Sequence, residues 1–375
     1  MTIEFIDLKA QQARIKDKLD VRIQAVLAGG AYIMGPEVRE LEGKLAEFCG
    51  AKHALTCANG TDALHLALMA LGAKAGDAIF CPSFTFAATA EIVPHVGATP
   101  VFVDVDGRTF NMCVKSLKRA IVHAKELGLR PAGIIPVDLF GLPADYEPIE
   151  TIARENGMWI IADSAQGFGA TYKDRTTGSI GDIATTSFFP AKPLGCYGDG
   201  GAVFTSNDEL AALIGSFRVH GKGSDKYDNV RIGVNSRLDT LQAAILLEKL
   251  AIYADELDAR QVVARRYSAL LSGRFQVPYI PNEMRSVWAQ YTLRAASTEQ
   301  RDAAMSALKA QNIPSVVYYP MPLHQQGAYK NYPADPAGLS TCTDLAKTVF
   351  SLPMHPYLTA EQQELVCAAI AKAGC

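Results

Sequence analysis

The sequence predicts an α/β protein whose mostly parallel sheet is covered by helices on both faces. From residue 53 onward, short apolar segments of strand length alternate with amphipathic segments of helix length. This alternation is typical of βαβ units. After Gly273 the segments follow a different order and suggest a small α+β unit. We therefore expect a large sheet domain followed by a small α+β domain, with the boundary near residues 245–275.

Two helices are expected before the sheet. The first covers residues 9–28, where Ile15, Leu19, Ile23 and Val26 recur at helical spacing, and it stops at Gly29. Pro36 suits the first turn of the second helix, which should end at Gly50.

The remaining elements are expected in this order. The strands of the large domain cover 53–57, 78–81, 101–105, 133–137, 158–162, 183–189 and 202–205, and helices cover 62–71, 114–127 and 146–155, with one more after 82–86. Residues 206–270 should be helical, including a long helix that is apolar on one side from Leu238 to Leu271. The small domain should contain strands at 291–294 and 315–319, a helix near 298–311 and a last helix from Ala360.

The composition is that of a globular enzyme. Of the 375 residues 49% are hydrophobic and 20% are charged, and the net charge is −3, which excludes a disordered chain and argues against nucleic-acid binding. No apolar run approaches the ~20 residues that span a bilayer, and the N-terminus has no signal-peptide core, so we expect a cytoplasmic protein without membrane contact. The 8 cysteines and 7 histidines show no metal-binding spacing, so no metal site is expected.

One lysine stands out by its position. Lys192 lies between Pro190 and Pro193, which excludes a helix interior and places it on a loop after an apolar strand. Burial on such a loop would lower the pKa of the amine and make it a nucleophile. The alternative is an ordinary solvated surface lysine.

An upstream carboxylate, Asp163, favours a buried nucleophilic lysine over a solvated surface lysine. Asp163 ends the apolar run 158–162, where it is placed at the carboxyl end of a buried strand, the usual ligand edge of an open α/β sheet. Enzymes that use pyridoxal phosphate need such a carboxylate for the pyridinium nitrogen and a lysine for the Schiff base. Asp163 could instead cap the following helix.

At these residues the sequence resembles a known family. The segments ADSAQGFGA and TTSFFPAKPLGCYGDGG are similar to those of the DegT/DnrJ/EryC1/StrS nucleotide-sugar aminotransferases, and the resemblance extends from FIDLKAQQARIKDKLD to SLPMHPYL. It is strongest to the members that act on UDP-2-acetamido-2-deoxy-3-oxo-glucuronate in bacterial O-antigen biosynthesis. The resemblance implies a fold-type I enzyme dependent on pyridoxal 5'-phosphate, with a seven-stranded sheet domain over residues 1–250 and a small domain over 251–375.

The resemblance also implies the residues that hold the cofactor. It assigns the Schiff base to Lys192 and the pyridinium contact to Asp163. Gly60, Thr61 and Ser187 would bind the phosphate, Phe86 would stack on the ring, and Gln166 would lie near the ring hydroxyl. Each has a simpler alternative: a plain N-cap by Asn59 or Thr61 at the helix start, a strand hydroxyl for Ser187, core packing for Phe86 and a helix-surface side chain for Gln166.

Three further segments carry predicted site residues, among them Asn235, which the resemblance places at the phosphate of the partner's cofactor. Asn235 and Arg237 lie in GVNSRLD, a loop that in the family crosses to the neighbouring subunit, so a homodimer with shared active sites is implied. The stretch from Phe217 to Arg231, including His220, is locally basic and would suit a nucleotide diphosphate. Tyr318 and Tyr319 match the substrate-side pair, although close relatives have histidine at the position of Tyr318. Asn235 could instead cap the long helix, and the basic stretch could be a solvated loop.

The expected reaction transfers an amino group, with glutamate as donor, to a ketone of a nucleotide-linked sugar. Lys192 would move the proton, which argues against the dehydratase branch of the family, where histidine stands at this position. The alternatives are a 4-keto-6-deoxy sugar aminotransferase, a nicotinamide-dependent oxidoreductase and a non-catalytic regulator that binds the cofactor. No GxGxxG follows the first strand, which counts against the oxidoreductase.

Overall fold

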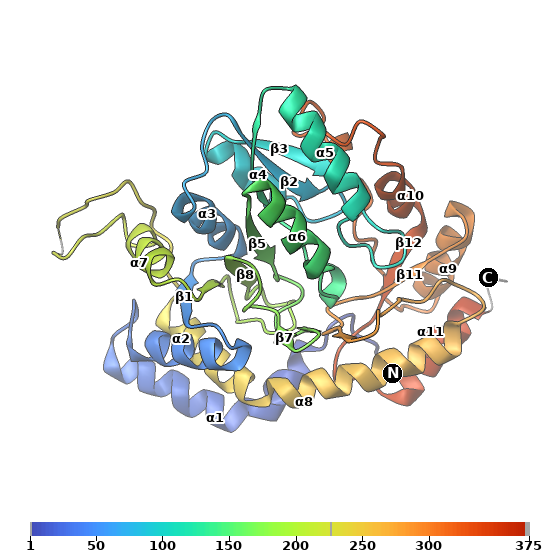
Figure 1. Ribbon diagram of the computed structural model, residues 1–375. Helices are drawn as coiled ribbons and strands as arrows, with labels where there is room; N and C mark the ends of the chain where they lie inside the picture. Colours follow the sequence, from blue (N-terminus) through green and yellow to red (C-terminus); the bar gives the residue numbers. More distant parts are fainter. Residues whose placement is uncertain (1, 226, 372–375) are drawn as a thin grey trace.

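A twisted sheet of seven strands forms the centre of the computed structural model, which describes residues 2–225 and 227–371 (Figure 1). Its strands are, in chain order, β1 (His53–Cys57), β2 (Asp77–Pro82), β3 (Thr99–Val103), β4 (Arg130–Ile134), β5 (Trp159–Asp163), β8 (Ile183–Ser187) and β9 (Gly201–Thr205). They lie in the order β1-β9-β8-β5-β4-β2-β3. Only β9 runs antiparallel to both of its neighbours, so the expected mostly parallel seven-stranded sheet is confirmed.

Two layers of helices cover the sheet because successive strand residues point to opposite faces. On one face, Phe80 and Ile160 pack with residues of α2 (Pro36–Cys49), α5 (Val114–Glu126), α6 (Tyr146–Asn156) and the first half of α8 (Thr240–Leu271). On the other face, Ile79 and Ile161 pack with residues of α3 (Gly60–Ala70), α4 (Ala88–His95) and α7 (Asp208–Phe217). A sheet buried on both faces explains why its strands are almost uniformly apolar in sequence.

The C-terminal part has a separate core. It contains β11 (Tyr291–Arg294), β12 (Val349–Leu352), α9 (Thr298–Ala310), α10 (Ser340–Thr348) and α11 (Ala360–Ala371). The long helix α8 serves both cores, since Leu257 packs with the sheet domain whereas Val263 packs with the C-terminal core. The division into residues 1–250 and 251–375 stays a prediction, and residue 250 lies inside this helix.

The remaining elements are short or lie at the N-terminus. Helix α1 (Leu8–Gly29) corresponds to the helix expected over residues 9–28, and it packs along α8. The other short elements are β6 (Thr171–Tyr172), β7 (Arg175–Thr176), β10 (Met284–Arg285) and the 3-10 turns η1 (Leu139–Gly141) and η2 (Leu323–Gln325). None of the helices within residues 2–225 and 227–371 is both long and apolar enough to cross a bilayer.

Two expected elements were wrong. Helix does not continue through residues 206–270: between α7 and α8 the chain forms a loop, which we call the 218–239 loop, with antiparallel bridges Val219–Asn235 and Lys222–Asn229. Its glycines allow this, because a Cβ on Gly233 would lie 2.1 Å from the Gly221 nitrogen. The expected strand 315–319 makes one bridge, Val316–Ser351, and no ladder, since Pro314 and Pro320 confine it.

Candidate active site

A buried carboxylate lies at the carboxyl edge of the sheet. Asp163 is the last residue of β5 and is 4% exposed. Its Oδ2 accepts a hydrogen bond from Thr89 Oγ1 at 2.9 Å, and its Oδ1 accepts one from the Ala165 N–H at 3.2 Å. Burial raises the pKa of Asp163, and the Thr89 bond, the Ala165 bond and the charge of Lys192 each oppose that rise. The carboxylate is thus fixed in orientation and needs a cationic partner to remain ionised.

Lys192 faces the same place from the connection between β8 and β9, which we call the lysine turn (residues 188–200). The side chain is half-buried, and its backbone N–H donates to the Phe189 carbonyl at 2.8 Å. Burial lowers the pKa of the Lys192 amine, and the charge of Asp163 opposes that shift. In the described part of the chain the ammonium makes no hydrogen bond or ion pair, so the amine is available for chemistry.

The N-terminus of α3 meets the end of β8. Asn59 caps this helix by accepting the Asp62 N–H at 2.8 Å, so of the two expected caps, Asn59 and Thr61, the structure has Asn59. A Cβ on Gly60 would lie only 2.7 Å from Ser187 Cβ, which shows how closely the helix end approaches that hydroxyl. Free N–H groups, the Thr61 hydroxyl and the Ser187 hydroxyl therefore gather at one positive helix end, a ready site for a phosphate.

A polar and aromatic wall continues the site toward the C-terminal part. Gln166 is buried, with Oε1 accepting the Phe140 N–H at 2.7 Å and Nε2 donating to the Tyr319 hydroxyl at 2.9 Å. The ring of Phe86 is 57% exposed and its centroid lies 6.4 Å from that of Tyr319. The alternatives of a helix-surface role for Gln166 and of core packing for Phe86 therefore do not hold, and a face of Phe86 is open for stacking.

Burial raises the pKa of both Tyr318 and Tyr319. Tyr318 lies beside the N-terminal segment, with its ring centroid 6.3 Å from that of Phe5. Tyr319 connects Gln166 with Phe86: its hydroxyl accepts a hydrogen bond from Gln166, and its ring lies beside the Phe86 ring. Tyr319 therefore belongs to the cluster around Asp163, whose charge also raises the pKa of Tyr319, and Tyr318 lies next to it.

The other predicted residues lie on the 218–239 loop. His220 and Asn235 are exposed and Arg237 is half-buried, and none of their side chains hydrogen-bonds a residue of the cluster around Asp163 in the described part of the chain. Asn235 does not cap α8, because Asp239 holds the N-cap position. Figure 1 shows this loop extending from the body of the molecule beyond α7.

Two residues that support the site were not singled out in the sequence. Thr89 on α4 orients Asp163, and the backbone N–H of Phe140, which has a φ of 59°, orients Gln166. In the sequence, a threonine shortly after FTF indicates a supporting role only weakly. The left-handed conformation of Phe140 cannot be predicted from the sequence, because packing sets it. The turn containing Phe140 is held by Asn111, whose Nδ2 donates to Leu142 O and Pro143 O at 3.0 and 2.9 Å.

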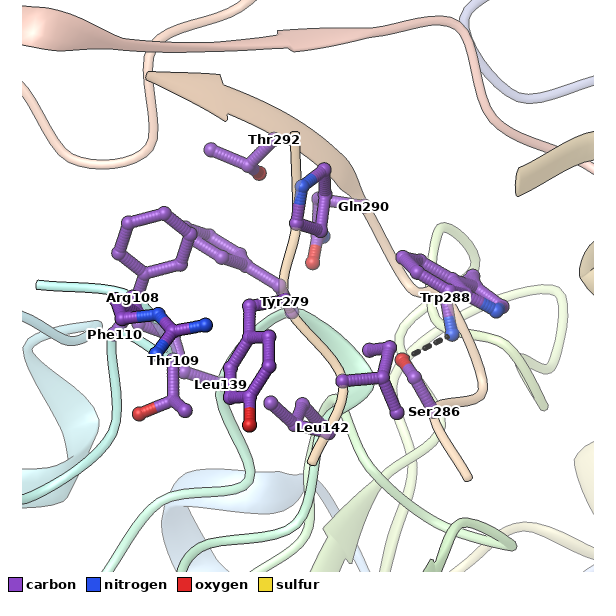
Figure 2. A pocket seen from close by; sticks show the side chains of 13 residues that line it. Arg108, Thr109, Phe110, Leu139, Leu142, Tyr279, Ser286, Trp288, Gln290 and Thr292 are labelled. Atoms are coloured by element: carbon purple, nitrogen blue, oxygen red, sulfur yellow. Dashed lines mark hydrogen bonds between the residues drawn. The ribbon is translucent and has the colours of Figure 1, made fainter. Parts of the chain in front are cut away.

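A separate hollow, which has room for about 20 Å³ of water-sized centres, lies behind that turn (Figure 2). Arg108, Phe110, Tyr279, Trp288 and Gln290 line it, and none of the predicted site residues does. Phe140 separates it from Gln166, so it belongs to the junction of the two cores and not to the candidate active site.

The cluster passes a test of fit for pyridoxal 5'-phosphate. Asp163 supplies the buried anion that a pyridinium nitrogen requires, the α3 end with Ser187 supplies a phosphate cradle, and the amine of Lys192 lies within electrostatic reach of Asp163. Fold and site together define the fold-type I class of enzymes that use this cofactor. No group of residues suited to a metal ion occurs in the described part of the chain.

Comparison with known proteins gives the narrower assignment. The model of the DegT/DnrJ/EryC1/StrS aminotransferase family matches residues 13–371. UDP-2-acetamido-2-deoxy-3-oxo-D-glucuronate aminotransferase of Pseudomonas aeruginosa is 49% identical over 369 residues, covering 98% of this chain and 99% of that protein. A crystal structure of a DegT DnrJ EryC1 StrS aminotransferase from Brucella abortus aligns with a TM-score of 0.97 at 52% identity over 99% of both chains. The PLP form of the sugar aminotransferase Spr1654 from Streptococcus pneumoniae aligns with a TM-score of 0.86 at 26% identity over 95% of this chain and 96% of that chain.

The chain therefore belongs to the DegT/DnrJ/EryC1/StrS aminotransferase family. It is a sugar aminotransferase that depends on pyridoxal 5'-phosphate. The fold and cofactor expected from the sequence are confirmed, and the nicotinamide-dependent and non-catalytic alternatives fall away.

Proposed function

We propose that this enzyme transfers the amino group of glutamate to the C3 ketone of UDP-2-acetamido-2-deoxy-3-oxo-glucuronate, in the synthesis of a bacterial surface polysaccharide. The observation that carries the proposal is the pairing of Lys192 with buried Asp163 in a chain 49% identical over nearly its full length to an aminotransferase named for that substrate. A cytoplasmic location, expected from the N-terminal sequence, belongs to the same proposal.

In this proposal Lys192 is the catalytic base and acid. Bound pyridoxal phosphate supplies an electron sink that accepts the electrons of a broken C–H bond. The lysine turn keeps the amine half-buried, and burial lowers its pKa, which favours the neutral amine that acts as the base. Neutral Lys192 takes the proton from the carbon that bears the amino group and returns a proton to the cofactor side.

Asp163 maintains the charge of the cofactor ring. Its buried carboxylate is most stable as an ion when a protonated nitrogen faces it, because burial alone raises its pKa. The hydrogen bond from Thr89 fixes Oδ2 of Asp163, so a protonated nitrogen can approach the carboxylate from one defined direction. Gly60, Thr61 and Ser187 bind the phosphate, Phe86 covers one face of the ring, and Gln166 contacts the ring hydroxyl.

The substrate side is assigned to Tyr318, Tyr319 and the 218–239 loop. Arg237 suits the sugar carboxylate, and His220 and its basic neighbours suit the diphosphate. In this proposal the loop reaches the active site of a second copy, where Asn235 meets the cofactor phosphate. Ile232 (93% exposed) and Val230 (52% exposed) lie close together on this loop, so a second copy that covers it would bury both apolar side chains.

The test is an assay with defined substrates. The purified enzyme, saturated with pyridoxal phosphate, is incubated with glutamate and either UDP-2-acetamido-2-deoxy-3-oxo-glucuronate or a 4-keto-6-deoxy nucleotide sugar, and product mass is measured. We expect amination of the first. Turnover of the 4-keto sugar alone would replace the substrate assignment, and absence of glutamate-driven conversion of the bound cofactor to its amine form would refute the donor.

A further inference from the structure

A second lysine, Lys249, is buried close to the lysine turn. It lies in the middle of α8 and is 1% exposed. Its ammonium forms no ion pair among the described residues: Glu256, further along the helix, instead accepts hydrogen bonds from Gln11 and Tyr357. Burial lowers the pKa of Lys249 to about 8. A buried cation without a carboxylate is costly, so its contacts need an explanation.

Both contacts of the ammonium go to the segment that follows Lys192. Nζ donates to the Gly195 carbonyl at 2.6 Å and lies 4.3 Å from the centroid of the Tyr197 ring. Gln242 on the same helix adds a third contact by accepting the Tyr197 N–H at 2.9 Å. Helix α8 therefore holds this segment at two residues, Gly195 and Tyr197.

The held segment controls the position of Lys192. Gly195 has no space for a side chain, because a Cβ would lie 2.5 Å from Phe189 O and 2.6 Å from Pro190 O, the residues just before Lys192. The Cys196 N–H closes the turn onto the Phe188 carbonyl at 2.7 Å. A shift at Gly195 would therefore push directly on the backbone that carries the catalytic amine.

We propose that Lys249 is a positioning residue for Lys192. Its ammonium fixes the Gly195 carbonyl and the Tyr197 ring against α8, and this anchor sets where the Lys192 amine stands relative to Asp163. The inference rests on the proposed role of Lys192 and adds a residue outside the reacting groups.

A role in stability alone makes the opposite prediction for an apolar replacement. An apolar side chain of similar length removes the cost of burying a charge and leaves the Gly195 carbonyl without its donor, so a role in stability alone predicts a change in the thermal midpoint with kcat unchanged. Positioning predicts lower turnover even where stability is unchanged or higher. Lys249→Met separates the two, because methionine keeps the length of the chain and removes both the charge and the donor.

The experiment uses full-length enzyme saturated with pyridoxal phosphate. Three quantities are measured: kcat with glutamate and the keto sugar, the pH titration of cofactor absorbance, which reports the linkage to Lys192, and the thermal midpoint. For Lys249→Met we expect kcat to fall about tenfold, since small misplacements of reacting groups have effects of this order or larger. The absorbance titration should be displaced, and the midpoint should not fall in parallel. Lys249→Gln keeps a donor without the charge and should give intermediate values.

Tyr253→Phe is the matched control. It lies one turn further along α8 and loses one buried bond to a backbone carbonyl, Tyr253 OH to Phe168 O at 2.6 Å, without touching the lysine turn. It should lower the thermal midpoint and leave the titration unchanged. Wild-type kcat and titration in Lys249→Met would overturn the proposal, and if that variant does not fold, the same result in Lys249→Gln would overturn it. If the wild-type enzyme itself showed no transamination, the proposed function would fail instead.

Discussion

The lysine turn and the 218–239 loop both carry predicted active-site residues, yet they are built in different ways. The turn is short, tied to β8 and β9 at its ends and anchored by α8, so its own chain completes the geometry around Lys192. The loop projects from the body beyond α7 and exposes Ile232, and its His220 and Asn235 are also exposed. The difference separates residues that contacts within one chain hold in place, such as Lys192, from residues on an exposed loop, to which we assign a role at the active site of a second copy only as part of the proposed function.

The largest effect is expected at the turn. Lys192→Ala should reduce turnover at least about 10⁴-fold, because both the covalent attachment and the proton transfer are lost. Borohydride reduction followed by peptide mass measurement should find pyridoxal phosphate on Lys192 in the wild type and no adduct in the variant. An adduct on another lysine would refute the assignment.

Asp163→Asn should lower kcat about 10³-fold while the cofactor stays bound. An amide has the same size but cannot balance the charge of a pyridinium nitrogen, so the electron sink weakens. The cofactor content and kcat of the purified variant test this. Turnover near that of the wild type would remove Asp163 from the mechanism.

For the projecting loop we expect a loss of about 100-fold in Asn235→Asp, because a carboxylate would face the cofactor phosphate of the partner. Mixing this variant with Lys192→Ala should restore activity, since each heterodimer would contain one site with both defects and one with neither. Purified, folded heterodimers without any activity would show that the loop serves its own chain.

Thr89→Val should have a smaller effect, with kcat lowered about tenfold, because Asp163 loses one hydrogen bond worth about 1–2 kcal/mol. The pH profile of kcat should also move, since the Thr89 bond opposes the rise in the pKa of Asp163 and its loss lets that pKa rise further. The profile of Thr85→Val, which loses only the bond to Thr89, is the control.

The smallest effect on activity is expected behind the site, at buried Asp138. It accepts bonds from Ser164 Oγ at 2.6 Å and Tyr146 OH at 2.7 Å, and burial raises its pKa to about 7. A carboxyl whose pKa is higher in the folded state stabilises the fold at low pH and loses that contribution as pH rises from about 4 to 7. Urea unfolding should therefore show Asp138→Asn gaining stability relative to the wild type over this range, by roughly 1–3 kcal/mol. An equal pH dependence in both proteins would contradict it.

Local sequence features predicted the groups of the lysine turn but not their supports. Two prolines placed Lys192 on a loop, and an apolar run placed Asp163 at a strand end, because backbone restriction and burial act over a few residues. Thr89 and the Phe140 N–H become neighbours of Asp163 and Gln166 only through tertiary packing. The helix expected across residues 206–270 failed because a bridge between Val219 and Asn235 outweighed local propensity.

The antiparallel strand β9 sets a condition on how the chain folds. Strand β1 lies at the edge of the sheet and has β9 as its only neighbour, with His53 paired to Thr205. During synthesis β1 therefore has no strand to pair with until more than half of the protein has been made, and making the residues between β1 and β9 takes on the order of ten seconds. Pairing over such a separation is slow to form. Helix α2 shields β1 in the finished structure through Leu41 and Leu45, and the same helix, made just before the strand, is placed to cover it while the ribosome completes the rest.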